Sequence, residues 1–390
     1  MSHLIEEYAK NLGVKIGKPI FEPHYMPVTD EKYITVHVDN KIDSKYYEFF
    51  PETLDLLKNI LSPLGYKIYQ IGGADDPMLR EADKSYLGFS RKQTAYIVKN
   101  SSLHLGIDSF PIHLASVYDI PIIGLYSHIY PQHAYPYWST KEKVRILEAD
   151  RKGNKPSYSY QESPKSINTI KPEEIVKNAC ELLGLNSTLS MNTLHIGEQY
   201  SKPCIEIIPN FFGEAAELKN QILNIRMDYF FNEECLMQWA SAYNVHIVSD
   251  QPIHPEVLKR CRNNIKEITF LINETNKFSL EYLQFVKNLG IVMIGECSNQ
   301  KAISEVREYY FDFLIEPEAK INEKIINELH DKQNLRFLTK KDILSNGKRY
   351  YSKAHVDAGI VASDKWGSVI NQPSFWGDLD HYYIYESFKL

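Results

Sequence analysis

The sequence lacks the long apolar segment that a membrane-spanning helix requires. Although 43% of its 390 residues are apolar, no run approaches the roughly 18 residues needed to cross a bilayer. The first residues, MSHLIEEYAKNLG, carry acidic side chains where a secretory signal has basic ones. No membrane span is predicted, and we expect a cytoplasmic protein.

Cysteine is also scarce, and acidic residues outnumber basic ones. The five cysteines, at positions 180, 204, 235, 261 and 297, lack the spacing of a metal site or a disulfide scaffold. We expect reduced, mostly buried thiols and no metal site. The formal net charge of −6 disfavours a generally basic surface that would bind nucleic acid.

Two common nucleotide-binding motifs are missing as well. The chain contains neither the dinucleotide fingerprint G-x-G-x-x-G nor a Walker A lysine loop. Gly72 and Gly73 follow an apolar segment, but they indicate only a tight turn with close backbone approach. Nicotinamide chemistry and ATP hydrolysis therefore have no support, and no cofactor is predicted.

Strand and helix patterns alternate through the first half of the chain. This alternation predicts a Rossmann-like parallel sheet, in which ligands bind at the carboxyl ends of the strands. The expected strands cover 33–38, 66–73, 103–107, 121–127 and 144–149, and the expected helices cover 51–64, 93–99, 111–118 and 172–184.

The alternation restarts after a polar stretch at 186–202. A chain of this length can bury two cores, so we expect two α/β domains, 1–185 and 200–390, with the aromatic tail at 364–388 packed on a domain. The expected strands of the second domain cover 204–210, 225–231, 245–250, 265–273 and 291–296, and its helices cover 214–223, 233–243, 256–263, 280–289 and 303–310.

The turn Asp108-Ser109-Phe110-Pro111 is the most informative segment. It joins a buried strand to a helix that has proline in its first turn. The free amides and the dipole of such a helix favour an anion, and a phosphate or diphosphate is the usual occupant. The alternative is that Asp108 and Ser109 only cap the helix.

The segments G-Y-K-I-Y-Q-I-G-G-A-D-D (65–76) and L-H-L-G-I-D-S-F-P-I-H-L-A-S (103–116) carry a resemblance. With the alternation around them, they resemble the donor-binding half of glycosyltransferase family nine, the ADP-heptose:lipopolysaccharide heptosyltransferases. The resemblance covers about residues 30–185. It implies a two-lobed GT-B-like architecture, with the order of the lobes exchanged because about two hundred residues follow the donor-like half.

The resemblance also implies which residues contact a nucleotide-sugar donor. The family's D-[ST]-G-x-x-H turn matches Asp108, Ser109 and His113, and its phosphate-binding lysine matches Lys45. Each match has a plainer alternative. His113 could be a core histidine, Lys45 a surface lysine, and Asp75 and Asp76 a turn and helix cap. The implied donor-binding residues are Lys45, Asp75, Asp76, Asp108, Ser109, Phe110, His113, Ser127 and His128.

Phe110 departs from the family pattern, which has glycine at this position. Phenylalanine disfavours a positive φ, so we expect the local backbone or the sugar fit to differ from the family. Ser127 and His128 begin the aromatic segment 126–138, which directly follows a strand. Aromatic faces suit sugar rings, although tyrosine and tryptophan also fill domain interfaces.

The second domain should supply the acceptor side. Inverting transfer needs a general base, and the candidates at strand ends are Glu214, Asp228 and Asp250, each of which could instead be a cap or a surface charge. Asp378-Leu379-Asp380 has the D-x-D form of metal-dependent glycosyltransferases but lacks their context.

The prediction is a metal-independent, inverting glycosyltransferase that moves a hexosyl, heptosyl or pentosyl group from a nucleotide-diphosphate donor. The acceptor hydroxyl could belong to a glycan, lipopolysaccharide, a protein or modified nucleic acid. The alternatives are a nucleotide-sugar epimerase of GT-B-like shape and a non-catalytic nucleotide-sugar-binding protein.

Overall fold

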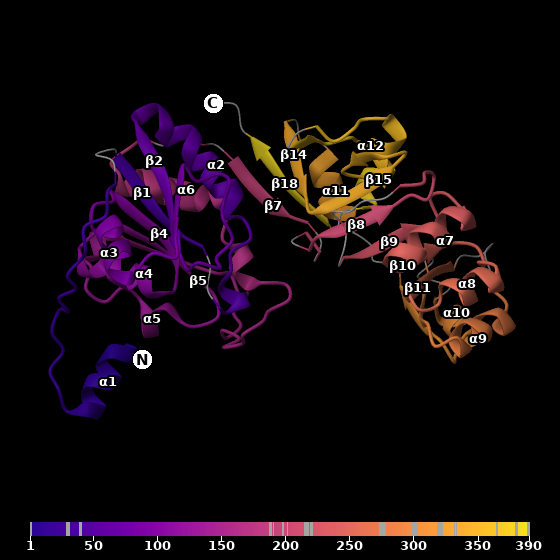
Figure 1. Cartoon of the computed structure of the whole chain (residues 1–390), viewed down its shortest axis with the longest axis horizontal. Coiled ribbons are helices and arrows are strands. Elements are labelled where there is room, and N and C mark those ends of the chain that lie inside the picture. The colour runs from indigo at the N-terminus through magenta and orange to yellow at the C-terminus, as the bar shows by residue number, and fades with distance from the viewer. Residues whose placement is uncertain are drawn as a thin grey trace. The chain divides into compact units, whose positions relative to one another are not determined.

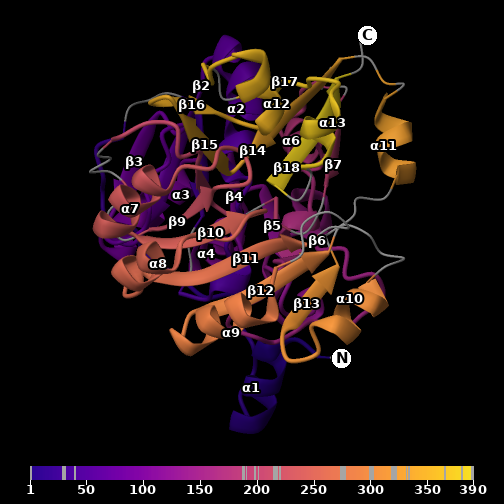
Figure 2. The same ribbon diagram turned by 90° about the vertical axis from the view of Figure 1, so that its right-hand side faces the viewer.

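A computed structural model divides the chain into two compact units, Met1–Thr193 and Leu194–Ser387 (Figures 1 and 2). Within residues 1–390 the structure describes 2–28, 32–38, 41–186, 189, 191–196, 199–200, 202–213, 218, 221–272, 278–297, 303–317, 323–330, 332, 334–363, 366–378 and 381–387. Each unit is described below by itself.

The first unit is built on a six-stranded parallel sheet. Its order, β3-β2-β1-β4-β5-β6, reverses direction between β1 and β4, as in doubly wound folds. The strands are β1 (Lys32–His37), β2 (Tyr66–Gly72), β3 (Lys84–Leu87), β4 (Leu103–Ile107), β5 (Ile122–Tyr126) and β6 (Val144–Glu148). The five strands predicted for this half are confirmed; β3, a short edge strand, was not predicted.

Helices cover both faces of this sheet, so β4 and β5 are buried along their whole length. Helix α2 (Phe50–Leu61) packs against α6 (Pro172–Leu182), and α3 (Arg91–Lys99) packs against α4 (Phe110–Val117) on the other face (Figure 1). The remaining helical elements are α1 (Leu4–Leu12), α5 (Pro131–Ala134) and the 3₁₀ turns η1 (Asp43–Lys45), η2 (Ser62–Leu64), η3 (Lys141–Lys143) and η4 (Ser166–Thr169).

The second unit has an eight-stranded sheet in the order β13-β12-β11-β10-β9-β8-β15-β16. All neighbouring strands are parallel except β15 and β16, which are antiparallel. The strands are β8 (Cys204–Ile207), β9 (Ile222–Arg226), β10 (Asn244–Ser249), β11 (Ile265–Ile272), β12 (Val292–Cys297), β13 (Leu314–Pro317), β15 (Lys341–Ser345) and β16 (Lys348–Tyr350). The α/β class with parallel sheets is confirmed.

Four crossover helices connect β9 to β13 in one direction, so the right-handed rule places them on one face of the sheet (Figure 1). They are α7 (Glu233–Ala242), α8 (Pro255–Cys261), α9 (Leu280–Asn288) and α10 (Ile303–Tyr309). Along β10, fully buried residues alternate with less buried ones. The sheet therefore has a well-covered face and a second face that carries polar side chains.

A smaller sheet in the order β17-β14-β18-β7 contains the aromatic tail. Phe337, Phe375, Trp376 and Tyr382 form the core beneath it, which confirms that the tail packs in a folded unit. Its strands are β7 (Met191–His195), β14 (Leu335–Thr339), β17 (Gly367–Ser368) and β18 (Tyr382–Ser387); helices α11 (Glu323–His330), α12 (Lys353–Ala358) and α13 (Pro373–Trp376) complete the unit. This sheet was not predicted.

Two boundaries predicted in the second half are wrong. Strand β9 begins at Ile222, where we expected a helix over 214–223. It ends at Arg226, so Asp228 lies in a turn and not inside a strand. The isoleucine-rich run around Leu223 fits a buried strand as well as a helix, and only pairing with β8 and β10 decides between them.

Candidate functional site

Several polar side chains meet at the carboxyl edge of the first unit's sheet. Strand β4 ends at Ile107, Asp108 and Ser109 form the turn, and α4 begins at Phe110. The fixed φ of Pro111 suits the first helical turn. On the neighbouring strand, β1 is followed by the loop that contains η1 and Lys45. Because both strands are parallel, their following loops meet at the same edge.

Lys45 and Asp108 form a buried ion pair at this edge. The Lys45 ammonium donates to Asp108 Oδ2 at 2.6 Å and to the Asp108 carbonyl oxygen at 2.9 Å. Both side chains are only about one-tenth exposed, at 11% and 10%. The structure thus brings together the two residues on which the predicted donor site most depends.

His113, one turn into α4, completes this group. Its Nε2 lies 3.8 Å from Asp108 Oδ1, and its side chain is 39% exposed. Burial alone would raise the pKa of Asp108, but the nearby His113 imidazole and the ammonium of Lys45 lower it below its ordinary value. Asp108 is therefore held as a carboxylate, and the alternative that His113 is a core residue is wrong.

Ser109 occupies the N-cap position of α4, yet its side chain makes no capping hydrogen bond. Its hydroxyl oxygen lies instead 2.9 Å from His37 Nδ1, at the end of β1. The alternative that Ser109 serves only as a side-chain cap is therefore wrong. The amides at the start of α4 have no cap from this residue.

Phe110 is the first residue of α4 and does not have a positive φ. The expectation that the local backbone or the sugar fit differs from the family stays a prediction. Its ring is 43% exposed and contacts Phe21 at 6.0 Å and the guanidinium of Arg91 at 5.6 Å between centres. Here a side chain is accommodated without strain because the residue is helical.

Asp75 and Asp76 differ in exposure and in their contacts. Asp75 is exposed, whereas Asp76 folds back and accepts a hydrogen bond from the Gly73 amide at 2.8 Å. Gly72 permits this turn, because a Cβ there would collide with the Asp76 carboxylate. The same carboxylate lies 3.9 Å from His37 Nε2. Asp76 is thus a turn residue that also faces the site.

The segment after β5 borders the same edge. Ser127 is buried and its hydroxyl donates to the Ser44 carbonyl oxygen at 3.1 Å, which supports the loop before Lys45. His128 is buried too, and burial followed by the charge of Lys45 lowers its pKa. Its carbonyl oxygen accepts a hydrogen bond from Tyr158, so a later loop also closes on this edge.

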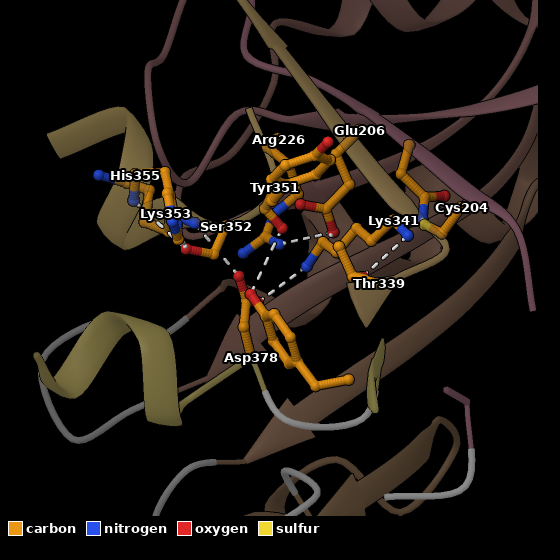
Figure 3. A network of polar contacts seen from close by, with 12 residues as sticks. Cys204, Glu206, Arg226, Thr339, Lys341, Tyr351, Ser352, Lys353, His355 and Asp378 are labelled. Atoms are coloured by element: carbon orange, nitrogen blue, oxygen red, sulfur yellow. Dashed lines mark hydrogen bonds and ion pairs between the residues drawn. The ribbon is translucent and has the colours of Figure 1, made fainter. Parts of the chain in front are cut away.

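In the second unit, the polar face of the large sheet carries a buried network of charges (Figure 3). Lys341 donates to Glu206 Oε1 at 3.0 Å and to Asp378 Oδ1 at 2.8 Å. Arg226 donates to Glu206 Oε1 at 2.9 Å and grips both oxygens of Asp228, at 2.6 and 2.8 Å. Sequence analysis missed Glu206, Arg226 and Lys341, although charges inside apolar strand patterns are a usable signal.

The three predicted base candidates differ in their outcome. Glu214 lies outside the described residues. Asp228 is held by Arg226. Asp250 follows β10, and among the described residues no hydrogen-bond donor reaches its buried Oδ1. Asp228 donates its amide to Val248, which places the two aspartates near the carboxyl ends of adjacent strands.

The D-x-D motif does not present a free acidic pair in the part that is described. Asp378 is bound to Lys341 and accepts a further bond from the Lys353 amide at 3.3 Å, while Leu379 and Asp380 lie outside the described residues. Within the described ranges, no group of three or more histidine, cysteine, aspartate or glutamate residues could hold a metal ion. No described helix is long and apolar enough to cross a bilayer.

Comparison with protein-family models and with curated proteins gives no match. Among solved structures, the chain is similar to a family 9 glycosyl transferase from Veillonella parvula, with 19% identity over 46% of this chain and 49% of that one and a TM-score of 0.33. It is similar to E. coli ADP-heptose lps heptosyltransferase II, with 14% identity, 46% and 50% coverage and a TM-score of 0.32. It is also similar to the E. coli heptosyltransferase WaaC with ADP, with 16% identity, 45% and 54% coverage and a TM-score of 0.31. The chain spans about half the length of these structures.

Proposed function

We propose that this protein is a glycosyltransferase whose first unit binds a nucleotide-diphosphate sugar and whose second unit holds an acceptor hydroxyl. The observation that carries the proposal is the buried Lys45–Asp108 pair beside the start of α4. A lysine and the amino end of a helix provide positive charge for a diphosphate. The family resemblance of the sequence around the pair supports the same assignment.

The chemistry assigns a role to each group. Departure of the nucleoside diphosphate builds negative charge, which Lys45 and the amides at the start of α4 stabilise. Asp108 is acceptor-only as a carboxylate, so it binds hydroxyl groups of the sugar rather than phosphate oxygens. Lys45 supplies the charge that a metal ion would otherwise supply, and we propose metal-independent, inverting transfer in the cytoplasm.

Asp250 is the general base that we propose for the acceptor side. Asp250 is only partly buried, and no ion pair holds its carboxylate among the described residues, whereas both oxygens of Asp228 accept from Arg226. Asp250→Asn should lower the turnover of sugar transfer about 100-fold, because a positioned base contributes at least that much, and should leave donor affinity unchanged. Single-turnover transfer and donor titration measure the two effects, and weakened donor binding without a loss in turnover would refute the role.

Lys45→Met should weaken nucleoside-diphosphate binding by about 10- to 100-fold, because it removes a charged hydrogen-bond donor from the phosphate site. Lys143 offers a matched control. It donates to Asp119 Oδ2 at 2.6 Å and to the Asp119 carbonyl oxygen at 3.0 Å, nearly the geometry of the Lys45 pair, but it is 42% exposed. Isothermal titration of Lys143→Met should match the native chain; equal losses in the two variants would contradict a specific site.

The test of the proposed function is a binding panel on the full chain. ADP-, UDP-, GDP-, CMP- and dTDP-linked sugars are compared by thermal shift, with and without divalent cations. Stabilisation by one nucleotide class without a cation supports the donor site, and loss of that shift in an Asp108→Ala chain that is still folded locates it. Silence across the panel contradicts the proposal, and isomerised sugar formed from donor alone would indicate an epimerase.

A further inference from the structure

His37 links the donor turn to the loop after β2. It is the last residue of β1 and is largely buried. Its Nδ1 lies 2.9 Å from Ser109 Oγ, and its Nε2 lies 3.9 Å from Asp76 Oδ2. One imidazole therefore touches a serine on one side and faces a carboxylate on the other, although these residues come from three separate loops and strands.

The carboxylate of Asp76 decides which nitrogen of His37 carries the proton. Asp76 is fixed in place by the Gly73 amide, at 2.8 Å from Oδ2. A lone pair on Nε2 would be repelled by this anion, whereas an N–H is attracted to it. Burial lowers the pKa of His37 to about 4, so the ring is neutral at pH 7 and carries only one proton. That proton belongs on Nε2.

This tautomer sets the direction of the bond to Ser109. With the proton on Nε2, Nδ1 can only accept, so the Ser109 hydroxyl donates its hydrogen to His37. The oxygen of Ser109 then has lone pairs left and no hydrogen to offer. We propose that Asp76 and His37 polarise Ser109 into a hydrogen-bond acceptor that recognises a ribose or sugar hydroxyl of the bound donor, and not a phosphate oxygen.

This inference rests on the proposed function, since it specifies which part of the nucleotide-sugar donor Ser109 binds. Ser109 is the contacting residue, while His37 and Asp76 are positioning residues that act through it. A phosphate oxygen is itself an acceptor, so two acceptors would face each other if Ser109 met the diphosphate. The phosphates are left to Lys45 and to the amides of α4.

The first arm of the test reads the tautomer directly. Nitrogen NMR of the full chain with ¹⁵N-labelled histidine, assigned by loss of one signal set in His37→Gln, should show a protonated Nε2 and a bare Nδ1 for His37 at pH 7. Asp76→Asn should move the ring toward the other tautomer, and Asp119→Asn, which removes a carboxylate elsewhere in the unit, should not. A protonated Nδ1 in the native chain would overturn the proposal.

The second arm separates hydroxyl from phosphate recognition. ADP-glucose, UDP-glucose, GDP-mannose and inorganic pyrophosphate are titrated against native chain, Ser109→Ala and Ser109→Thr. Ser109→Ala should lower the affinity for the nucleotide sugar that binds about tenfold and leave pyrophosphate binding unchanged, and Ser109→Thr should restore native affinity. An equal loss for pyrophosphate overturns the proposal. If the native chain binds none of the four probes, the proposed function is overturned instead.

Discussion

Replacing Lys341 by Met is expected to lower the free energy of unfolding of the second unit by about 3–5 kcal/mol. The Lys341 side chain is 2% exposed and its ammonium contacts both Glu206 and Asp378. Its removal leaves carboxylates buried without that partner, and an uncompensated buried charge costs this much. The two carboxylates raise the pKa of Lys341 against the opposing effect of burial, so the native chain keeps the charge. Urea unfolding measures the loss.

An exposed pair supplies the control for Lys341. Lys259 contacts Glu256 at 2.7 Å, close to the 2.8 Å of the Lys341–Asp378 contact, but its side chain is 51% exposed. Lys259→Met should change the free energy of unfolding by less than about 1 kcal/mol. Adding Asp378→Asn to Lys341→Met should recover part of the loss, because it removes a carboxylate that had become unpaired. A further additive loss would contradict the network.

Acid should destabilise the first unit by about 6 kcal/mol between pH 7 and pH 4. Burial lowers the pKa of His37 to about 4 and that of His104 to about 3, while histidines in the unfolded chain titrate near 6.5. Between these values the unfolded state binds more protons, so the free energy of unfolding falls as pH falls. Each histidine contributes ~1.4 kcal/mol per pH unit in this window, or ~3 kcal/mol by pH 4.

Denaturant unfolding at a series of pH values tests this slope. His104→Asn keeps a hydrogen-bonding group that can replace Nδ1 at Thr35 Oγ1, a contact of 3.0 Å. It should halve the slope of the free energy of unfolding between pH 6 and pH 4. His24→Gln is the control, because His24 is exposed. An unchanged slope in His104→Asn would show that this histidine does not carry the acid sensitivity.

The sequence predicts the first sheet well because its central strands are short, mostly apolar segments between turn signals. Strand β4, over Leu103–Ile107, is buried on both faces, and the mostly apolar composition of this segment indicates such burial. Strand β3, over Lys84–Leu87, pairs only at the sheet edge and is half-buried, so it carries no comparable pattern. A strand that is buried on both faces is therefore easier to predict from a single sequence.

The placement of β15 beside β8 could not be predicted. Ile343 pairs with Glu206 although the two residues lie far apart in the chain. No local sequence pattern indicates which distant strand a segment will pair with. The smaller sheet was missed for the same reason, because β14 is completed by β17 and β18 from the tail. Non-local pairing depends on the whole fold and not on the segment.

The candidate site was foreseen where a motif is local and missed where it is assembled. Asp108, Ser109 and His113 stand within one turn and its helix, so their proximity follows from the sequence. Lys45 entered only through family resemblance, and the structure places it on Asp108. His37 was missed because it reads as the end of an ordinary strand, and its role depends on Ser109 and Asp76 arriving from elsewhere.

The late position of β15 sets an order of assembly on the ribosome. The six strands of the first sheet are complete once Glu148 has emerged, whereas β8 must wait from Ile207 until Lys341 for its neighbour. At about 5–20 residues per second, that interval lasts on the order of ten seconds. During this interval Glu206 lacks its ion-pair partner Lys341, and the edge of β8 that will pair with β15 is unpaired. We therefore expect chaperones to bind the second unit during synthesis, and slower translation should prolong that binding.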